Sequence, residues 1–247
     1  MSLKFSGRIV SLVPSLTELL IDLGLKEQIV GRTRFCILPE DKVGGIPVIG
    51  GTKNPRLDKI RALKPDIIIA NHEENRKEDI IQLQSEFRVF LTDIRSVQDA
   101  IQSIRDIGNL FGISEQTQSL TQKIELEYNN RPQCQPKSSL YLIWREPWMG
   151  VGTDTYINDV MQHWRLSNVL HSKNRYPEID LEHTTFDQPE LILLSSEPFP
   201  FKTKHANEMR TYFPGARFEL VDGKWFSWYG SRMLPAFRAL NEWRKQL

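Results

Sequence analysis

Two short segments in the second half of the chain hold four of its six tryptophans. The first segment, 144–150, follows an apolar run and reads WREPWMG, and the second, 225–232, reads WFSWYGSR. In α/β sheets, ligands bind outside the carboxyl ends of the strands. Indole rings there can stack on a flat ligand while Arg and Ser side chains hold its polar rim. The candidate ligand-binding residues are Trp144, Trp148, Trp225, Trp228 and Arg232; the rings could instead anchor loops on the core.

The first half of the chain places similar side chains after its own apolar runs. The candidates there are Ser15, Arg34, Phe35, Thr52 and His72. His72 precedes Glu73 and Glu74, and these residues offer nitrogen and oxygen donors for a metal ion. The same three residues also suit a solvated helix start, where acidic side chains are favourable. We favour the helix start and predict no metal site.

Signatures of catalysis are missing from the sequence. It contains no Gly-rich phosphate loop, no G-x-S-x-G and no H-E-x-x-H, so we predict no catalytic residue and no cofactor. Two cysteines, Cys36 and Cys134, cannot form a disulfide framework. The formal net charge of +1 argues against nucleic-acid binding. No apolar run is long enough to insert into a membrane.

The pattern of elements that would position these residues is α/β. An apolar β-branched run at 8–13 is followed by Ser15-Leu16-Thr17-Glu18, which has capping-box spacing, and Gly24 marks the helix end. We predict an N-terminal α/β lobe over 1–95, a helical connector over 96–136 with a long helix at about 114–130, and a C-terminal α/β lobe over 137–247. Each lobe is expected to be Rossmann-like.

An internal repeat supports two similar lobes. Residues 57–69 and 181–193 each place Leu-acid eight residues before Pro-acid and an apolar strand, without a gap. The repeat puts Asp58 and Glu182 at equivalent positions, early in what we predict to be equivalent helices. Acidic residues there could simply complement the helix dipole, or they could have a shared function.

The chain resembles the iron-siderophore, haem and vitamin B12 substrate-binding proteins of ABC importers. The resemblance covers nearly the whole chain, and the motifs that carry it occur in the same order along the sequence. They are RIVSLVPS at 8–15 with Thr17-Glu18, Gly31 then Pro39, LDKI through KPD at 57–66, Tyr176-Pro177 before Leu181-Glu182, and Trp225-Phe226 before Ser231-Arg232. The resemblance implies two α/β lobes joined by one long helix, with the ligand cleft between them. It also implies that Asp58 and Glu182 dock onto a permease dimer.

The resemblance is less decisive about the ligand. Phe35 stands where haem and corrinoid binders often have Tyr, and Thr52 and Asn71 stand where the B12 binder has tryptophans. Trp144, Trp148 and Tyr176 fall where members of the family place aromatic rings over the ligand. Four arginines could pair with an anionic chelate: Arg32, Arg34, Arg145 and Arg232. The implied ligand is a small-molecule metal chelate, either a ferric siderophore or a corrinoid.

We therefore expect a monomeric, non-enzymatic binding protein that delivers a metal chelate to an ABC importer. One alternative is a leaderless cytoplasmic protein that binds or senses a corrinoid or metal complex without a permease. A less favoured one is an enzyme that handles a metal or tetrapyrrole through His72, Glu73 and Glu74. The expected location is periplasmic or extracytoplasmic if a leader has been removed, and cytoplasmic otherwise, because the first strand begins near Arg8 with no signal segment before it.

Overall fold

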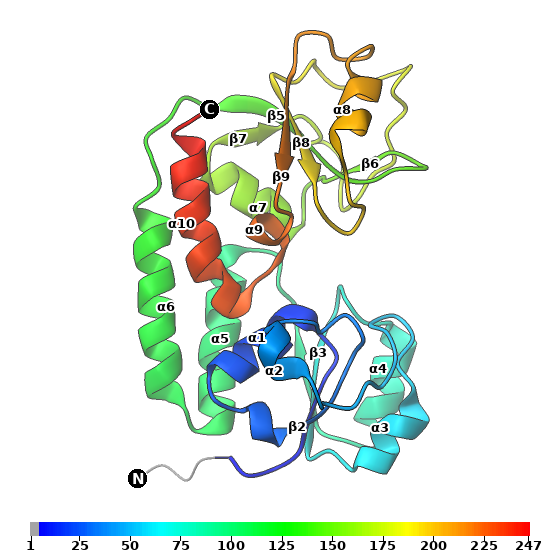
Figure 1. Cartoon of the computed structure of the whole chain (residues 1–247), viewed down its shortest axis with the longest axis vertical. Coiled ribbons are helices and arrows are strands. Elements are labelled where there is room, and N and C mark those ends of the chain that lie inside the picture. Colours follow the sequence, from blue (N-terminus) through cyan, green and yellow to red (C-terminus); the bar gives the residue numbers. More distant parts are fainter. Residues whose placement is uncertain (1–4) are drawn as a thin grey trace. The chain divides into compact units, whose positions relative to one another are not determined.

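The computed structural model describes residues 5–247, which form two compact α/β units (Figure 1). Unit 1 contains the chain up to Ile94, then Gln98–Ile124 and Tyr229–Arg232, and unit 2 contains Arg95–Val97, Glu125–Trp228 and Met233–Leu247. The predicted α/β class is confirmed. Residues 96–136, predicted as a connector, are divided between the two units: 98–124 belong to unit 1, and 96–97 and 125–136 belong to unit 2. The second of these boundaries lies within α6 (Ser114–Asn129). The predicted long helix is thus present.

Unit 1 is built on a four-stranded parallel sheet of order β2-β1-β3-β4. The strands are β1 (Ile9–Ser11), β2 (Ile29–Arg32), β3 (Ile67–Asn71) and β4 (Val89–Thr92). All five residues of β3 are buried, as the unbroken apolar run requires of a parallel strand covered on both faces. Because all four strands are parallel, the segments that follow them emerge at one edge of the sheet.

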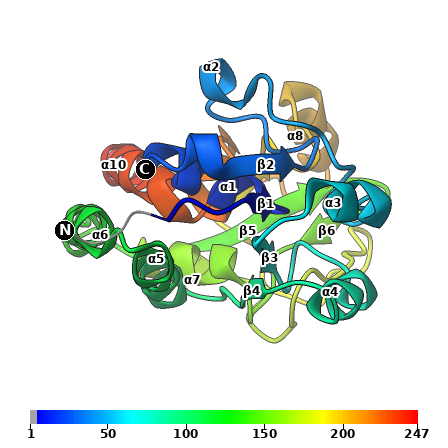
Figure 2. The same cartoon turned by 90° about the horizontal axis from the view of Figure 1, so that it is seen from below.

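Helices cover both faces of this sheet. They are α1 (Pro14–Asp22), α3 (Leu57–Leu63), α4 (Lys77–Gln84) and α5 (Val97–Phe111), with short turns at η1 (Lys26–Gln28), α2 (Glu40–Val43) and η2 (Gly230–Arg232). Figures 1 and 2 show α3 and α4 on one face and α1 and α5 on the other. Ile60 of α3 and Leu83 of α4 pack with Val10 and Ile68 of the sheet. Burial of these side chains fixes the strand ends that carry the candidate residues.

The start of α1 differs from the prediction, and its end agrees. The helix begins at Pro14, with Val13 as a cap that has no side-chain hydrogen bond, so the capping box at Ser15 and Glu18 is wrong. Proline is favoured in the first helical turn, and the Glu18 carboxylate binds Arg232 instead. At the other end, Gly24 has φ of +83° and its N–H donates to Ile21, as in a Schellman motif.

Unit 2 contains a five-stranded sheet in which β6-β5-β8-β9 form the main order and β7 also pairs with β5. The strands are β5 (Lys137–Trp144), β6 (Met149–Gly150), β7 (Leu166–Asn168), β8 (Leu191–Ser195) and β9 (Arg217–Val221). Only the short β6 is antiparallel; the other pairings are parallel. The segments after β5, β8 and β9 therefore share one edge, as they do in unit 1.

The helices of unit 2 include the last turns of α6 and four elements of its own: α7 (Tyr156–His163), α8 (Thr203–Met209), α9 (Lys224–Ser227) and α10 (Met233–Arg244). Buried polar bonds join them. Trp164, after α7, donates its Nε1–H to Asn241 of α10 (2.9 Å), and Arg244 donates to the Trp164 carbonyl (2.8 Å). Within residues 5–247, no helix is both long and apolar enough to cross a membrane.

The internal repeat holds for the strands but not for the helices. Both copies end in a buried parallel strand, β3 in unit 1 and β8 in unit 2. Asp58 is the second residue of α3, whereas Glu182 lies among bends with no helix, so the prediction of equivalent helices is wrong. The Asp180 side chain accepts the N–H groups of Glu182 and His183, which starts a helix-like turn that the chain does not continue.

His163 is held tightly at the end of α7. Its ring stacks on Tyr128 of α6 with centroids 3.4 Å apart, and its Nε2–H donates to the Tyr128 carbonyl (2.6 Å). Burial and the charge of Arg131 together outweigh the hydrogen bond to the Tyr128 carbonyl and lower the pKa of His163 to about 4. The imidazole is therefore neutral in the folded protein at pH values where an unfolded chain would protonate it.

We predict that the free energy of unfolding falls as pH drops from about 6.5 to about 4. Between these pH values His163 is protonated in the unfolded state but stays neutral in the folded state. The free energy of unfolding therefore falls by up to about 1.4 kcal/mol for each pH unit. Urea unfolding at several pH values measures the slope. His163→Gln should flatten it, whereas the same change at the exposed His171 should keep the wild-type slope. Equal slopes in all three proteins would contradict the assignment.

Candidate functional site

The carboxyl edge of the unit 1 sheet presents an aromatic and cationic pair. Arg34 and Phe35 follow β2, and the Arg34 guanidinium carbon lies 5.0 Å from the Phe35 ring centre. The Arg34 N–H donates to the Gly50 carbonyl (2.8 Å), which fixes this segment. The Phe35 side chain is 49% exposed. Across residues 5–247, no carboxylate forms an ion pair with Arg34, so its charge can meet a ligand.

The other unit 1 candidates have different surroundings. Ser15 is buried inside α1, and Thr52 uses its carbonyl to accept the side chain of Asn75 (3.1 Å). His72 is exposed. Asn71 turns back to accept the N–H groups of Glu73 (2.8 Å) and Glu74. These bonds make 72–74 a turn rather than the predicted helix start, because α4 begins only at Lys77.

The Arg232 guanidinium binds a carboxylate of its own unit. Its Nε–H donates to Glu18 Oε2 (3.0 Å), and a second N–H donates to Glu18 Oε1. Glu18 is buried and the Arg232 side chain is 29% exposed. Ser231 donates to Asp22 beside it (2.7 Å). A planar guanidinium held this way by two parallel bonds stabilises α1 against η2.

We expect Glu18→Ala to lower the free energy of unfolding by about 2 kcal/mol, because it leaves a mostly buried guanidinium without this carboxylate. Urea denaturation measures the effect. Asp22→Asn, which alters the neighbouring exposed bond, is the matched control and should stay within about 0.5 kcal/mol of wild type. A Glu18→Ala protein as stable as the control would show that the pair contributes nothing.

The carboxyl edge of the unit 2 sheet carries a chain of aromatic contacts. Trp144, at the end of β5, meets Phe199 edge-on with centroids 5.9 Å apart, and Phe199 lies 4.8 Å from Phe201. Phe201 stacks in turn on Trp148 at 5.9 Å. Trp144 is 40% exposed, whereas Trp148 packs on the core. Trp144 therefore presents its ring to solvent, and Trp148 also anchors its loop.

Phe199 and Phe201 were missed from the sequence. They belong to SEPFPF at 196–201, directly after the predicted strand at 191–195. The strand-end argument that selected Trp144 and Trp228 would have selected them as well. We name residues 196–201 the β8 turn.

Arg145 is already neutralised by acids of its own unit. It donates to both carboxylate oxygens of Glu208 (2.8 and 3.2 Å) and to Glu146, and its Cζ lies 5.6 Å from the Trp148 ring centre. The hydrogen bonds from Arg145 lower the pKa of Glu208. Arg145 thus holds Trp148 in place and has little charge left for an anionic ligand.

The remaining unit 2 candidates are half-buried aromatics. Trp228, just after α9, donates its Nε1–H to Glu197 of the β8 turn (2.6 Å). Trp225 lies within α9. Tyr176 lies in a loop with the Arg175 guanidinium carbon 5.5 Å from its ring centre. Trp144, Trp148 and Trp228 all follow β5 or β9 at the same edge of one sheet, while Tyr176 is in the long segment between β7 and β8.

The two candidate docking acids are both at the surface. The Asp58 side chain is 69% exposed and pairs with Arg56 (3.4 Å). Slight desolvation raises its pKa, but the Lys59 N–H and Arg56 outweigh this, so that the pKa is lowered and the group is anionic at neutral pH. Glu182 is exposed in the turn that starts at Asp180. Each acid can therefore reach a cationic partner.

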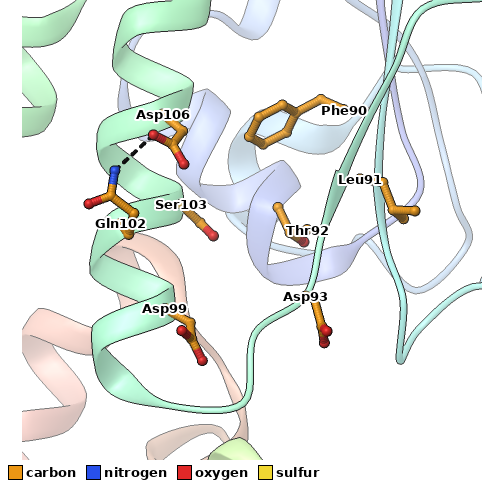
Figure 3. A pocket seen from close by; sticks show the side chains of 8 residues that line it. All are labelled: Phe90, Leu91, Thr92, Asp93, Asp99, Gln102, Ser103 and Asp106. Carbon is orange, nitrogen blue, oxygen red and sulfur yellow. Dashed lines mark hydrogen bonds between the residues drawn. The ribbon is translucent and has the colours of Figure 1, made fainter.

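A separate small pocket lies between the end of β4 and α5 in unit 1 (Figure 3). Its volume is about 250 Å³, which is below the range of drug-sized ligand sites. Asp93, Asp99 and Asp106 line it, and Gln102 donates to Asp106 (2.9 Å). In the described part of the chain, no three His, Cys, Asp or Glu side chains are arranged to hold a metal ion.

Comparison with known proteins gives the class of protein. Residues 9–211 match the periplasmic binding protein family, and the chain belongs to this family. The chain is 29% identical over 186 residues, or 69% of its length, to the ABC transporter substrate-binding lipoprotein YvrC of Bacillus subtilis, and the match spans 56% of that protein. It is 23% identical over 239 residues to a vitamin B12-binding protein of Pectobacterium carotovorum, covering 93% of this chain and 85% of the relative.

Solved structures with the same fold cover nearly the whole chain. The apo heme-binding protein RhuT of Roseiflexus sp. RS-1 superposes with a TM-score of 0.81 at 20% identity, over 98% of this chain and 99% of that one. The vitamin B12-binding protein BtuF of Vibrio cholerae gives 0.79 at 18% identity, over 97% of each chain. The family and these relatives are named as binding proteins rather than enzymes.

Proposed function

We propose that this chain is the extracytoplasmic substrate-binding component of an ABC importer and that it captures a metal chelate of the corrinoid type. The observation that carries the proposal is the aromatic edge of unit 2, where Trp144 of β5 is exposed beside Phe199 and Trp228 comes after β9 of the same sheet. Flat rings of this kind bind a flat macrocycle by stacking and by burial of apolar area. The relatives named as vitamin B12-binding proteins support the same ligand class.

The bonds that the candidate arginines already make within the protein favour a corrinoid over an anionic siderophore as the ligand. Arg145 binds Glu208 and Glu146, and Arg232 binds Glu18. A third arginine, Arg32, donates to the backbone carbonyls of Val43 and Cys36. Among the four predicted arginines, only Arg34 has a guanidinium that binds no carboxylate or carbonyl within residues 5–247. A catecholate complex with several negative charges would need more positive charge than this.

Haem is less well supported than a corrinoid. Phe35 of unit 1 can stack on a macrocycle, but its ring has no atom that ligates iron. Solved structures of heme-binding proteins share the fold, and fold alone does not determine the ligand. Haem is therefore a comparison ligand in the test below.

Isothermal titration with cobinamide, cyanocobalamin, hemin and a ferric tris-catecholate tests the ligand class. We expect a corrinoid to bind and the catecholate to fail. Trp144→Ala and Trp228→Ala should each weaken binding about tenfold, equivalent to about 1.4 kcal/mol of lost stacking. Trp243→Ala, in α10 against Phe226, is the control and should bind as wild type. Binding of the catecholate without a corrinoid would overturn the proposal, as would binding of no chelate.

The docking role of the two acids requires a cellular test. In cells whose corrinoid uptake depends on this chain, Asp58→Ala and Glu182→Ala should each reduce uptake several-fold, because each removes an exposed charge that can meet a permease arginine. Corrinoid affinity of the purified variants should be unchanged. Asp187→Ala, another exposed acid of unit 2, is the control. Normal uptake by the double variant Asp58→Ala/Glu182→Ala would show that these two acids do not dock the chain onto a permease, and the absence of any dependence of uptake on this chain would instead favour a sensing protein that works without a permease.

A further inference from the structure

The Glu197 carboxylate binds two side chains at the aromatic edge of unit 2. Its Oε1 accepts the Nε1–H of Trp228 at 2.6 Å and the hydroxyl of Ser227 at 2.9 Å. Both donors come from the end of α9, while Glu197 comes from the β8 turn. A carboxylate that accepts an N–H at this distance forms a charge-assisted bond, which is stronger than a neutral one.

The backbone around Glu197 leaves it little freedom to move. The Ser196 N–H donates to Val221 of β9 (3.0 Å), and the Gly223 N–H donates to the Ser196 hydroxyl (3.0 Å). A Cβ at Gly223 would lie only 2.6 Å from Glu197 Cγ and would overlap the Ser195 hydroxyl. The end of β9 therefore lies directly against the β8 turn, and the carboxylate is fixed before any ligand arrives.

The β8 turn also contacts the other exposed ring. The Phe199 N–H donates to the Ile143 carbonyl of β5 (3.2 Å), and the Phe199 ring meets Trp144. One six-residue turn thus touches Trp144 through a ring and Trp228 through a carboxylate. The two contacts differ in kind, since the first is apolar and the second fixes the direction of one N–H bond.

We propose that Glu197 is a positioning residue that holds the Trp228 indole in the orientation in which it stacks on the bound ligand. The inference rests on the proposed function for the existence of the ligand. An indole turns about two side-chain bonds, and ordering it costs free energy. Because Glu197 orders the indole in the free protein, ligand binding does not have to supply this free energy. Glu197 acts through Trp228, without contact to the ligand.

The orientation can be measured without any ligand. In a proton–nitrogen NMR spectrum the Trp228 indole gives one resonance, identified by its loss in Trp228→Phe. Glu197→Ala should move this resonance upfield and speed its exchange with solvent. Glu197→Gln keeps an oxygen acceptor and should retain slow exchange with a smaller shift. Glu219→Ala and Glu219→Gln, at a half-buried acid of β9 that pairs with Arg217, are the matched controls and should leave the resonance unchanged.

Corrinoid titration then tests the consequence for binding. Glu197→Ala should weaken affinity at least fivefold, Glu197→Gln should restore most of it, and the double variant Glu197→Ala/Trp228→Phe should bind no worse than Trp228→Phe alone. An unmoved indole resonance in Glu197→Ala would overturn the inference. Wild-type affinity for a corrinoid in Glu197→Ala or in Trp228→Phe would also overturn the inference. The proposed function would stand in that case, because a corrinoid still binds. Failure of every chelate to bind the wild-type chain would overturn both.

Discussion

The parallel pairing of strands is the constraint on which the candidate site depends. A parallel sheet sends every segment that follows a strand to the same edge. In unit 1 this edge gathers Arg34 after β2 and His72 after β3, and in unit 2 it gathers Trp144 at the end of β5 and Trp228 after β9. Residues that lie far apart in the sequence therefore reach one edge because each follows a buried apolar strand.

The side chains at these edges divide into those that are exposed and those that hold others in place. Trp144 and Phe35 present their rings to solvent. Trp148 is held between the core and Arg145, and Glu197 binds the indole of Trp228. Several polar groups that look suited to a ligand in the sequence thus serve to fix aromatic rings. Under the proposed function, affinity for a flat ligand would come from surfaces that are ordered before binding.

Sequence patterns predicted what depends on nearby residues and on burial. The apolar run of β3, the Gly24 helix end and the extent of α6 all follow from local chemistry. The start of α1 was not predicted correctly, because Glu18 is bound by Arg232, 214 residues away in the sequence. The conformation at Glu182 was not predicted either, because Asp180 caps a turn that forms no helix. Likewise, nothing local to Arg145 reveals that Glu208 neutralises it. Long-range ion pairs decided which candidate cations remain available.

The neutralised Arg145 has a consequence for the rate at which a ligand arrives. Arg145 pairs with two carboxylates, Glu208 and Glu146, so this cluster offers no net positive charge, and electrostatic attraction is screened beyond about 8 Å at physiological ionic strength. A ligand without net charge would meet this cluster by unsteered diffusion, so selection would take place at contact and through the lifetime of the complex. Its rate of arrival would then be nearly the same in dilute and in salty surroundings.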